Sequence, residues 1–167
     1  MSEKNLEKKI CLSPFLGLKQ TAYGDFSPCC SLNCNWKLDN SKVSDKVNSP
    51  EFKALREEFL AGKEPEICRR CWIEEATQKL SQREVYLREH PGLDRLIFNG
   101  EWKKGPAILS IDLSNVCNYG CKICNAGYST KFNAELPAHE RVKPIEISDE
   151  EIDRSIEVIK AAAKKLG

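Results

Sequence analysis

The segment Ala107-Ile108-Leu109-Ser110-Ile111-Asp112-Leu113 leads, after residues 114–116, into Cys117-Asn118-Tyr119-Gly120-Cys121-Lys122-Ile123-Cys124. The density of apolar residues over 107–113 predicts a β-strand buried on both faces, as in a parallel sheet. The predicted strand therefore ends in a loop that carries three cysteines within eight residues. Such a loop at the end of a strand is typical of sites built on α/β folds.

A helix is predicted after this loop. The sequence Ser148-Asp149-Glu150-Glu151 forms a capping box, which begins a helix over about 149–166. Its apolar stripe consists of Ile152, Ile156, Ile159, Ala163 and Leu166. Strand, loop and helix form the opening unit of a parallel α/β fold. One strand and one helix cannot bury a parallel sheet, so we expect the chain to be truncated within this unit.

Residues 1–92 predict a separate small module, made of a hairpin and helices, and residues 93–106 connect it to the unit at 107–167. Residues 10–30 form a short extended pair with a turn at Tyr23-Gly24-Asp25, and the polar residues 31–48 predict a loop. Ser49 and Pro50 begin a helix that ends at Gly62, and its apolar face is Phe52, Leu55 and Phe59. A second helical stretch is predicted from about Cys68 to Glu89, stopping at His90-Pro91-Gly92.

Composition narrows the class of protein. The chain has 167 residues, nine cysteines, two histidines and a formal charge of +1, so neither nucleic acid nor a membrane surface is expected as its partner. No stretch approaches the roughly 20 apolar residues of a membrane span, and residues 1–9 have no apolar signal core. We therefore expect a cytoplasmic protein whose thiols stay reduced. Metal binding is then the leading explanation of so many cysteines.

The loop at 117–124 has the donor set of a reactive metal site. Three thiolates, from Cys117, Cys121 and Cys124, can hold three irons of a [4Fe–4S] cluster and leave the fourth iron open. An open position separates a reactive metal site from a closed structural one. The alternative is a structural zinc site that combines Cys121 and Cys124 with two ligands from elsewhere in the chain.

A second set of cysteines lies in the N-terminal module. Cys11 precedes the predicted hairpin, Cys29 follows it, and Cys68-Arg69-Arg70-Cys71 opens a helix. The free amides of a first helical turn favour thiolates. Four thiolates would close a site around either a [4Fe–4S] cluster or zinc, since both accept this donor set.

The spacing Cys117-x3-Cys121-x2-Cys124 resembles the signature of the radical S-adenosylmethionine superfamily, where it follows the first strand of a partial (β/α)6 barrel. The resemblance implies that the open iron binds the amino and carboxylate groups of S-adenosylmethionine. One electron from the cluster would release methionine and a 5′-deoxyadenosyl radical, which abstracts a substrate hydrogen. Ile123 stands where the superfamily often has an aromatic residue, and we expect it to contact the adenine of the cofactor. No catalytic side chain is predicted.

The order Cys11, Gly24-x4-Cys29, Cys68-x2-Cys71 resembles the SPASM and twitch accessory domains of the same superfamily. The likeness runs from Cys11 to the end of the chain. It includes Gly24-Asp25-Phe26-Ser27-Pro28-Cys29-Cys30, Phe52-Lys53-Ala54-Leu55-Arg56, Gly62, Cys71-Trp72-Ile73-Glu74-Glu75, Ser81 and Arg83. It implies that Cys11, Cys29, Cys68 and Cys71 ligate one auxiliary [4Fe–4S] cluster, with Cys30 and Cys34 as alternative ligands.

The sequence therefore predicts the N-terminal part of a radical S-adenosylmethionine enzyme with one auxiliary cluster. The resemblance implies a peptide or small-metabolite substrate and a reductant such as flavodoxin or ferredoxin. We do not expect this chain alone to cleave S-adenosylmethionine efficiently, because later strands supply much of the cofactor site in that superfamily. The other hypotheses are a non-catalytic zinc-binding interaction module and an inactive truncated product.

Overall fold

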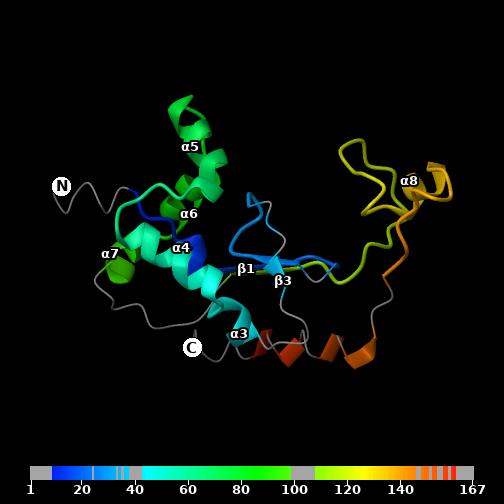
Figure 1. Cartoon of the computed structure of the whole chain (residues 1–167), viewed down its shortest axis with the longest axis horizontal. Helices are drawn as coiled ribbons and strands as arrows, with labels where there is room; N and C mark the ends of the chain where they lie inside the picture. The colour runs from blue at the N-terminus through cyan, green and yellow to red at the C-terminus, as the bar shows by residue number, and fades with distance from the viewer. Residues whose placement is uncertain are drawn as a thin grey trace.

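The computed structural model describes residues 9–23, 25–32, 34, 36–37, 43–98, 108–145, 148–150, 152–153, 156–157 and 159–160. These residues form a small mixed α/β structure (Figure 1). Its elements are α2 (Ser13–Leu16), β1 (Gly17–Gln20), β2 (Asp25–Ser27), β3 (Trp36–Lys37), α3 (Val43–Val47), α4 (Pro50–Leu60), the 3-10 helix η1 (Glu66–Cys68), α5 (Arg69–Ala76), α6 (Gln82–Glu89), α7 (Leu93–Phe98), β4 (Ile108–Ile111) and α8 (Thr130–Glu135). They include no barrel.

The strands make one mixed sheet in the order β3-β2-β1-β4. β1 and β2 form the predicted antiparallel hairpin, with Lys19 opposite Ser27. β4 confirms the strand predicted at 107–113 over residues 108–111, while Asp112 and Leu113 lie beyond its end. It pairs in parallel with β1, from Gly17 opposite Ile108 to Gln20 opposite Ile111. The prediction that both faces are buried is wrong, because β4 lies at the edge of the sheet and its Ser110 is exposed.

α4 begins and ends where the sequence predicts. The Ser49 hydroxyl accepts a hydrogen bond from the Phe52 amide, Pro50 is the first helical residue, and Gly62 has a φ of 69° just beyond the end. Phe52, Leu55 and Phe59 are buried, as predicted. Phe52 packs in a cluster with Leu18, Phe26 and Val47, and Phe59 packs in a larger one with Ile10, Leu12 and Leu16. The helix therefore ties the sheet to the helical part of the molecule.

Two predictions for the N-terminal module need correction. Residues 31–48 are not all loop, because they contain β3 and α3. Trp36 packs edge-on against Phe52, and the Lys46 ammonium donates to Gln20, so contacts with distant residues order this polar stretch. The helix predicted over about 68–89 is divided into η1, α5 and α6. Gln78 has a positive φ of 58°, and Ser81 starts α6 with a capping box to Glu84.

The C-terminal helix can be followed only in part. Residues 149–150, 152–153, 156–157 and 159–160 are helical, and the rest of the predicted helix, including Ala163 and Leu166, lies outside the described residues. Ile152, Ile156 and Ile159 are exposed on the described part of this helix. Among the described helices, none is both long and apolar enough to cross a membrane.

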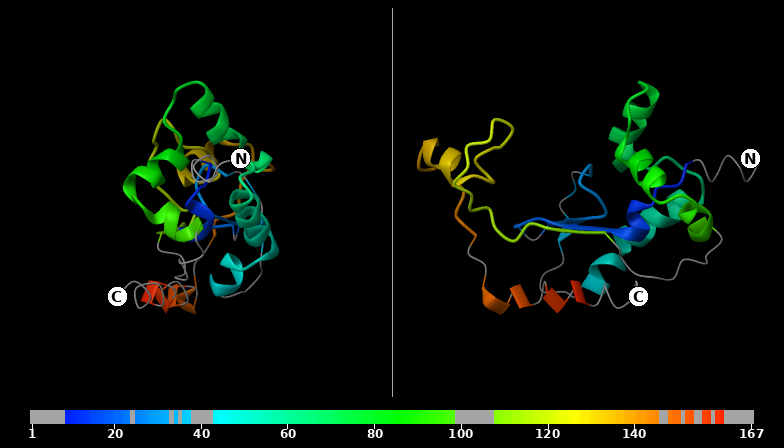
Figure 2. Two further views of the ribbon diagram at one scale, coloured as in Figure 1. Left: turned by 90° about the vertical axis from the view of Figure 1, so that its left-hand side faces the viewer. Right: turned by 180° about the vertical axis from the view of Figure 1, so that it is seen from behind.

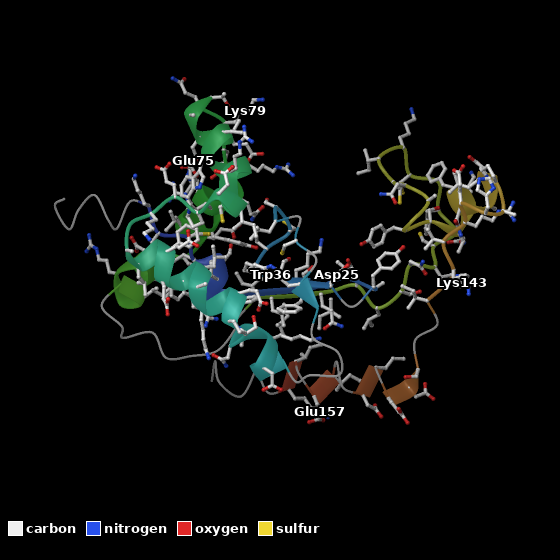
Figure 3. All side chains as sticks on the ribbon, viewed as in Figure 1. Asp25, Trp36, Glu75, Lys79, Lys143 and Glu157 are labelled. Atoms are coloured by element: carbon white, nitrogen blue, oxygen red, sulfur yellow. The ribbon has the colours of Figure 1, made fainter. Side chains whose placement is uncertain are left out.

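Helices α4, α5 and α6 lie at the opposite end of the molecule from the cysteine-rich loop (Figure 1 and Figure 2). Figure 2 shows α4, α5 and α6 gathered at one end, and the loop with α8 at the other, with the sheet between them. In Figure 3, Glu75 lies among the helices and Lys143 at the foot of the loop, with Trp36 and Asp25 between them. The two sets of predicted ligands are therefore far apart.

Candidate metal centres

Four cysteines from distant parts of the sequence line one cavity. Cys11 precedes α2, Cys29 follows β2, Cys68 is the last residue of η1, and Cys71 lies in the first turn of α5. They are the four ligands predicted for the auxiliary site. Cys11, Cys29 and Cys71 are buried, and Cys68 is half-buried.

The cavity is set into the main hydrophobic core. Pro14, Pro28, Leu32 and Phe59 provide apolar walls, and Gln82 and Arg83 provide polar ones. Its volume is about 20 Å³. One water needs roughly 10–15 Å³. The cavity therefore has room for at least one water, and four of the residues that line it are cysteines.

Burial keeps the thiols of Cys11, Cys29 and Cys68 protonated when no metal is bound. Burial raises the pKa of Cys11 to about 11 and that of Cys29 to about 12, although hydrogen bonds from the amide of Ser13 to Cys11 and from the amides of Ser31 and Leu32 to Cys29 act the other way. The pKa of Cys68 is raised by burial and then by the neighbouring Cys11, Cys29 and Cys71 thiolates. Several thiolates crowded in one place need a cation to share, and a metal group meets that need.

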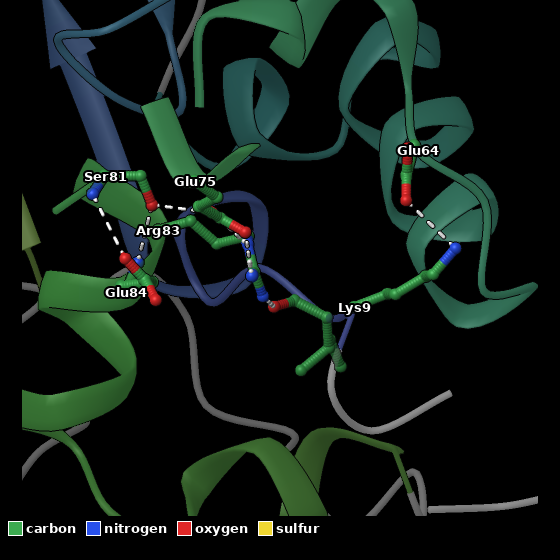
Figure 4. A network of polar contacts seen from close by, with 7 residues as sticks. Lys9, Glu64, Glu75, Ser81, Arg83 and Glu84 are labelled. Atoms are coloured by element: carbon green, nitrogen blue, oxygen red, sulfur yellow. Dashed lines mark hydrogen bonds and ion pairs between the residues drawn. The ribbon is translucent and has the colours of Figure 1, made fainter. Parts of the chain in front are cut away.

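A network of hydrogen bonds stiffens one wall of the cavity (Figure 4). Arg83 donates from Nε and Nη2 to the two Glu75 carboxylate oxygens, at 2.9 and 2.5 Å, and from Nη1 to the Ile10 carbonyl at 3.1 Å. The Ser81 hydroxyl donates to Glu75 at 2.6 Å. Sequence reasoning gave these side chains no role in the site, although Ser81-x2-Glu84 carried a visible capping signal.

The other three cysteines share one surface loop between β4 and α8. Cys117 and Cys124 are half-buried and Cys121 is exposed. Cys121 and Cys124 are linked by a turn, in which the Cys124 amide donates to the Cys121 carbonyl at 2.9 Å. Ile123, predicted to contact the cofactor, lies in this turn with 99% of its surface exposed.

Side chains outside the cysteines fix the path of this loop. Ser129 is fully buried, donates to the Tyr119 carbonyl at 2.9 Å and caps α8 by accepting from the Phe132 amide. Thr130 donates from its amide and its hydroxyl to the Cys117 carbonyl, at 3.0 and 2.8 Å. The loop therefore has a defined backbone even though most of its cysteine-bearing turn faces solvent.

The base of the loop is attached to the sheet by Tyr23 and Asn115. The Tyr23 hydroxyl donates to the Gly127 carbonyl, and its ring meets Tyr128 edge-on at 5.6 Å. The Asn115 amide donates to the Lys143 carbonyl and accepts from the Ile145 amide. No spacing rule pointed to Tyr23 or Asn115, because they act on residues distant in the sequence.

The alternative ligands of the N-terminal site differ in position. Cys30 is exposed, with its sulfur 3.9 Å from Gln82 Oε1, whereas Cys34 is half-buried and donates to the Phe26 carbonyl. Neither lines the cavity. Within the part of the chain that the structure describes, no three His, Cys, Asp or Glu side chains are gathered closely enough to hold a single metal ion.

Comparison of the whole chain with protein-family models, with curated proteins and with solved structures found no match.

Proposed function

We propose that this chain is part of a radical S-adenosylmethionine enzyme with two [4Fe–4S] sites. In this proposal, residues 1–92 are a twitch- or SPASM-like module, and residues 107–167 begin a partial (β/α)6 barrel. Cys117, Cys121 and Cys124 hold the cofactor-binding cluster, and Cys11, Cys29, Cys68 and Cys71 hold the auxiliary one. The observation that carries the proposal is that the four auxiliary cysteines, spread over 60 positions of sequence, line one cavity.

The shape of the N-terminal site favours a cluster over a single ion. Thiolates lie about 2.3 Å from a zinc ion, so the four sulfurs of a zinc site crowd around one point. Here the four thiols line one cavity, but they are not gathered closely enough around one point to hold a single metal ion. Apolar walls and the amides of Ser31 and Leu32, which hydrogen-bond to Cys29, also suit an iron–sulfur cluster, whose potential depends on burial and on hydrogen bonds to sulfur.

The place of the second cysteine set supports the catalytic part of the proposal. The loop leaves the carboxyl end of β4, which is paired in parallel with β1. Ligand sites of parallel α/β sheets lie at the carboxyl ends of their strands. The three cysteines are the donor set for a cluster with one open iron, and Ser129 and Thr130 hold the backbone around them.

The roles of the chain's own residues follow from this arrangement. When bound at the loop, a cluster with an open iron supplies the electron that cleaves S-adenosylmethionine. Cys117, Cys121 and Cys124 bind three of its irons, and Ile123 offers an exposed apolar side chain to the adenine of the cofactor. The substrate proposed is a peptide or small metabolite, and the reductant is a flavodoxin or ferredoxin.

Anaerobic reconstitution of the chain tests the proposal. We expect iron and sulfide near eight each per chain, since each cluster holds about four irons. Replacing Cys117, Cys121 and Cys124 together with Ala should remove one cluster and leave the other. Adding S-adenosylmethionine should change the electron paramagnetic resonance spectrum of the reduced chain, but not that of the triple variant.

Two results would contradict the proposal. Stoichiometric zinc without iron, after anaerobic purification and reconstitution, would favour a zinc-binding interaction module. If both clusters form but their electron paramagnetic resonance spectra do not change when S-adenosylmethionine is added, the loop cluster has no role in binding this cofactor.

A further inference from the structure

Glu75 and Arg83 form an ion pair in the wall of the four-cysteine cavity. Two hydrogen bonds join the guanidinium to both carboxylate oxygens, at 2.9 and 2.5 Å, and the Arg83 side chain is 8% exposed. Arg83 itself lines the cavity. The hydrogen bonds from Arg83 and Ser81 outweigh burial and lower the pKa of Glu75, so both partners are charged near neutral pH.

The pair connects two of the segments that carry the predicted ligands. Glu75 lies on α5, one turn after Cys71, and Arg83 lies on α6. Arg83 donates at 3.1 Å to the carbonyl of Ile10, the residue before Cys11, and its Cζ lies 5.0 Å from the centre of the Trp72 ring beside Cys71. A change in this pair is therefore transmitted to Cys11 and Cys71.

The pair also places two opposite charges beside the cavity. Arg83 lines the same cavity as Cys11 and Cys71, so its positive charge lies beside any group held there. While both groups are charged, their fields largely cancel at a distance. Removing either charge alone leaves the other uncompensated in a buried setting, where Coulomb interactions are strong.

We propose that Glu75 and Arg83 are a positioning pair that sets the reduction potential of a cluster held by Cys11, Cys29, Cys68 and Cys71. This inference rests on the proposed function, because it requires a cluster in this cavity. Reduction adds a negative charge to a cluster, so a nearby unpaired anion disfavours it and a nearby unpaired cation favours it. Glu75 and Arg83 therefore act on the potential with opposite signs.

The test is a redox titration of the reconstituted full chain in which Cys117, Cys121 and Cys124 are Ala, so that only the N-terminal cluster contributes. We expect Arg83→Gln to lower the midpoint potential and Glu75→Gln to raise it. Arg83→Lys keeps the charge and should shift the potential much less than Arg83→Gln. The double variant Glu75→Gln/Arg83→Gln should return toward the parent value.

A purely structural role would loosen the site in the same way in both single variants. Shifts of the same sign in Glu75→Gln and Arg83→Gln, or no shift in either, would overturn the inference while leaving the cluster in place. If Arg83→Gln does not fold, the midpoint potentials of Glu75→Gln and Arg83→Lys still test the inference. Glu75→Gln changes the net charge and should raise the potential, whereas Arg83→Lys keeps the charge and should shift it little. Absence of iron from this cavity in the parent chain would instead refute the proposed function, and the inference with it.

Discussion

The two cysteine sites of this molecule differ most in what surrounds them. Cys11 and Cys29 belong to the main hydrophobic core and Cys71 is also buried, whereas Cys121 and Ile123 of the loop face solvent. Folding of the helices therefore builds the first site, because the same side chains form the core and the cavity. The second site has a backbone fixed by hydrogen bonds, but its thiols are open on one side. The first arrangement suits a shielded cluster, and the second suits one that must meet another molecule.

The largest expected contrast comes from removing one ligand at each site. Metal binding contributes on the order of 10 kcal/mol to the folding of small structural metal sites. Cys68→Ala should therefore lose one cluster and also destabilise residues 9–98 of the reconstituted chain by several kcal/mol. Cys121→Ala should lose the other cluster with little effect on those residues. Iron analysis and thermal unfolding of both variants make the comparison, and equal losses of stability would contradict it.

Substitution of one apolar side chain in each region should affect the stability of the metal-free chain very differently. Phe59 is 1% exposed, contacts Trp72 at 6.2 Å between ring centres and lines the cavity. Phe59→Ala should cost about 3–5 kcal/mol of unfolding free energy, because it leaves a void in the core. Ile123→Ala, at a side chain 99% exposed, should change stability by less than about 0.5 kcal/mol. Urea unfolding of the metal-free chain measures both, and a large loss for Ile123→Ala would mean that the loop is packed in solution.

The buried thiols predict a loss of stability at alkaline pH in the metal-free chain. The pKa of Cys11 rises to about 11 and that of Cys29 to about 12 in the folded state, against 9.0 for an unperturbed thiol. Above pH 9 the unfolded chain therefore loses protons that the folded chain keeps, so stability should fall between pH 9 and pH 11 by roughly 1 kcal/mol per thiol for each pH unit.

Serine variants provide the control for this pH dependence. Cys11→Ser and Cys29→Ser should each flatten the fall in stability relative to the parent chain. Urea unfolding at pH 7 and pH 10 under reducing conditions makes the measurement. A stability that stays constant between these pH values would show that the Cys11 and Cys29 thiols are hydrated rather than buried.

The smallest expected effect is local to the loop. Ser129→Ala removes the cap of α8 and the bond to the Tyr119 carbonyl, at a cost of about 1–2 kcal/mol. Amide exchange should accelerate over residues 117–135 and stay unchanged over residues 9–98. Ser114→Ala, whose hydroxyl donates to the Ile145 carbonyl, is the matched control and should spare the turn at 121–124. Acceleration across both regions would mean that loop and core unfold together.

Local signals in the sequence predicted much of the fold. Ser49, Pro50 and Gly62 define α4 through contacts within a few residues, and the hairpin turn is equally local. The parallel character of the strand at 107–113 was also predictable, but its partner β1 was not, since pairing across a long stretch of chain leaves no local pattern. Trp36 and Lys46 are likewise positioned by distant residues, because Trp36 packs against Phe52 and Lys46 donates a hydrogen bond to Gln20.

The same distinction between local signals and contacts between distant residues applies to the candidate sites. The order and spacing of the cysteines were enough to name the four cysteines that line the cavity. It could not indicate that Glu75 and Arg83 form one wall, because ion pairing between α5 and α6 depends on the break at Gln78 that brings the two helices together. Sequence patterns thus selected the four cysteines, and the geometry identified their neighbours.

The pairing of β1 with β4 has a consequence for how the chain assembles during synthesis. Gly17 leaves the ribosome about ninety residues before Ile108, its partner in the parallel pair. Until then, β1 has β2 beside it and an open edge on its other side, and open edges invite pairing with other chains. Contacts between such distant residues also form slowly. The nascent chain therefore passes through a stage in which its helices can form while one side of the sheet is unprotected, and crowding or slow elongation at that stage would favour aggregation.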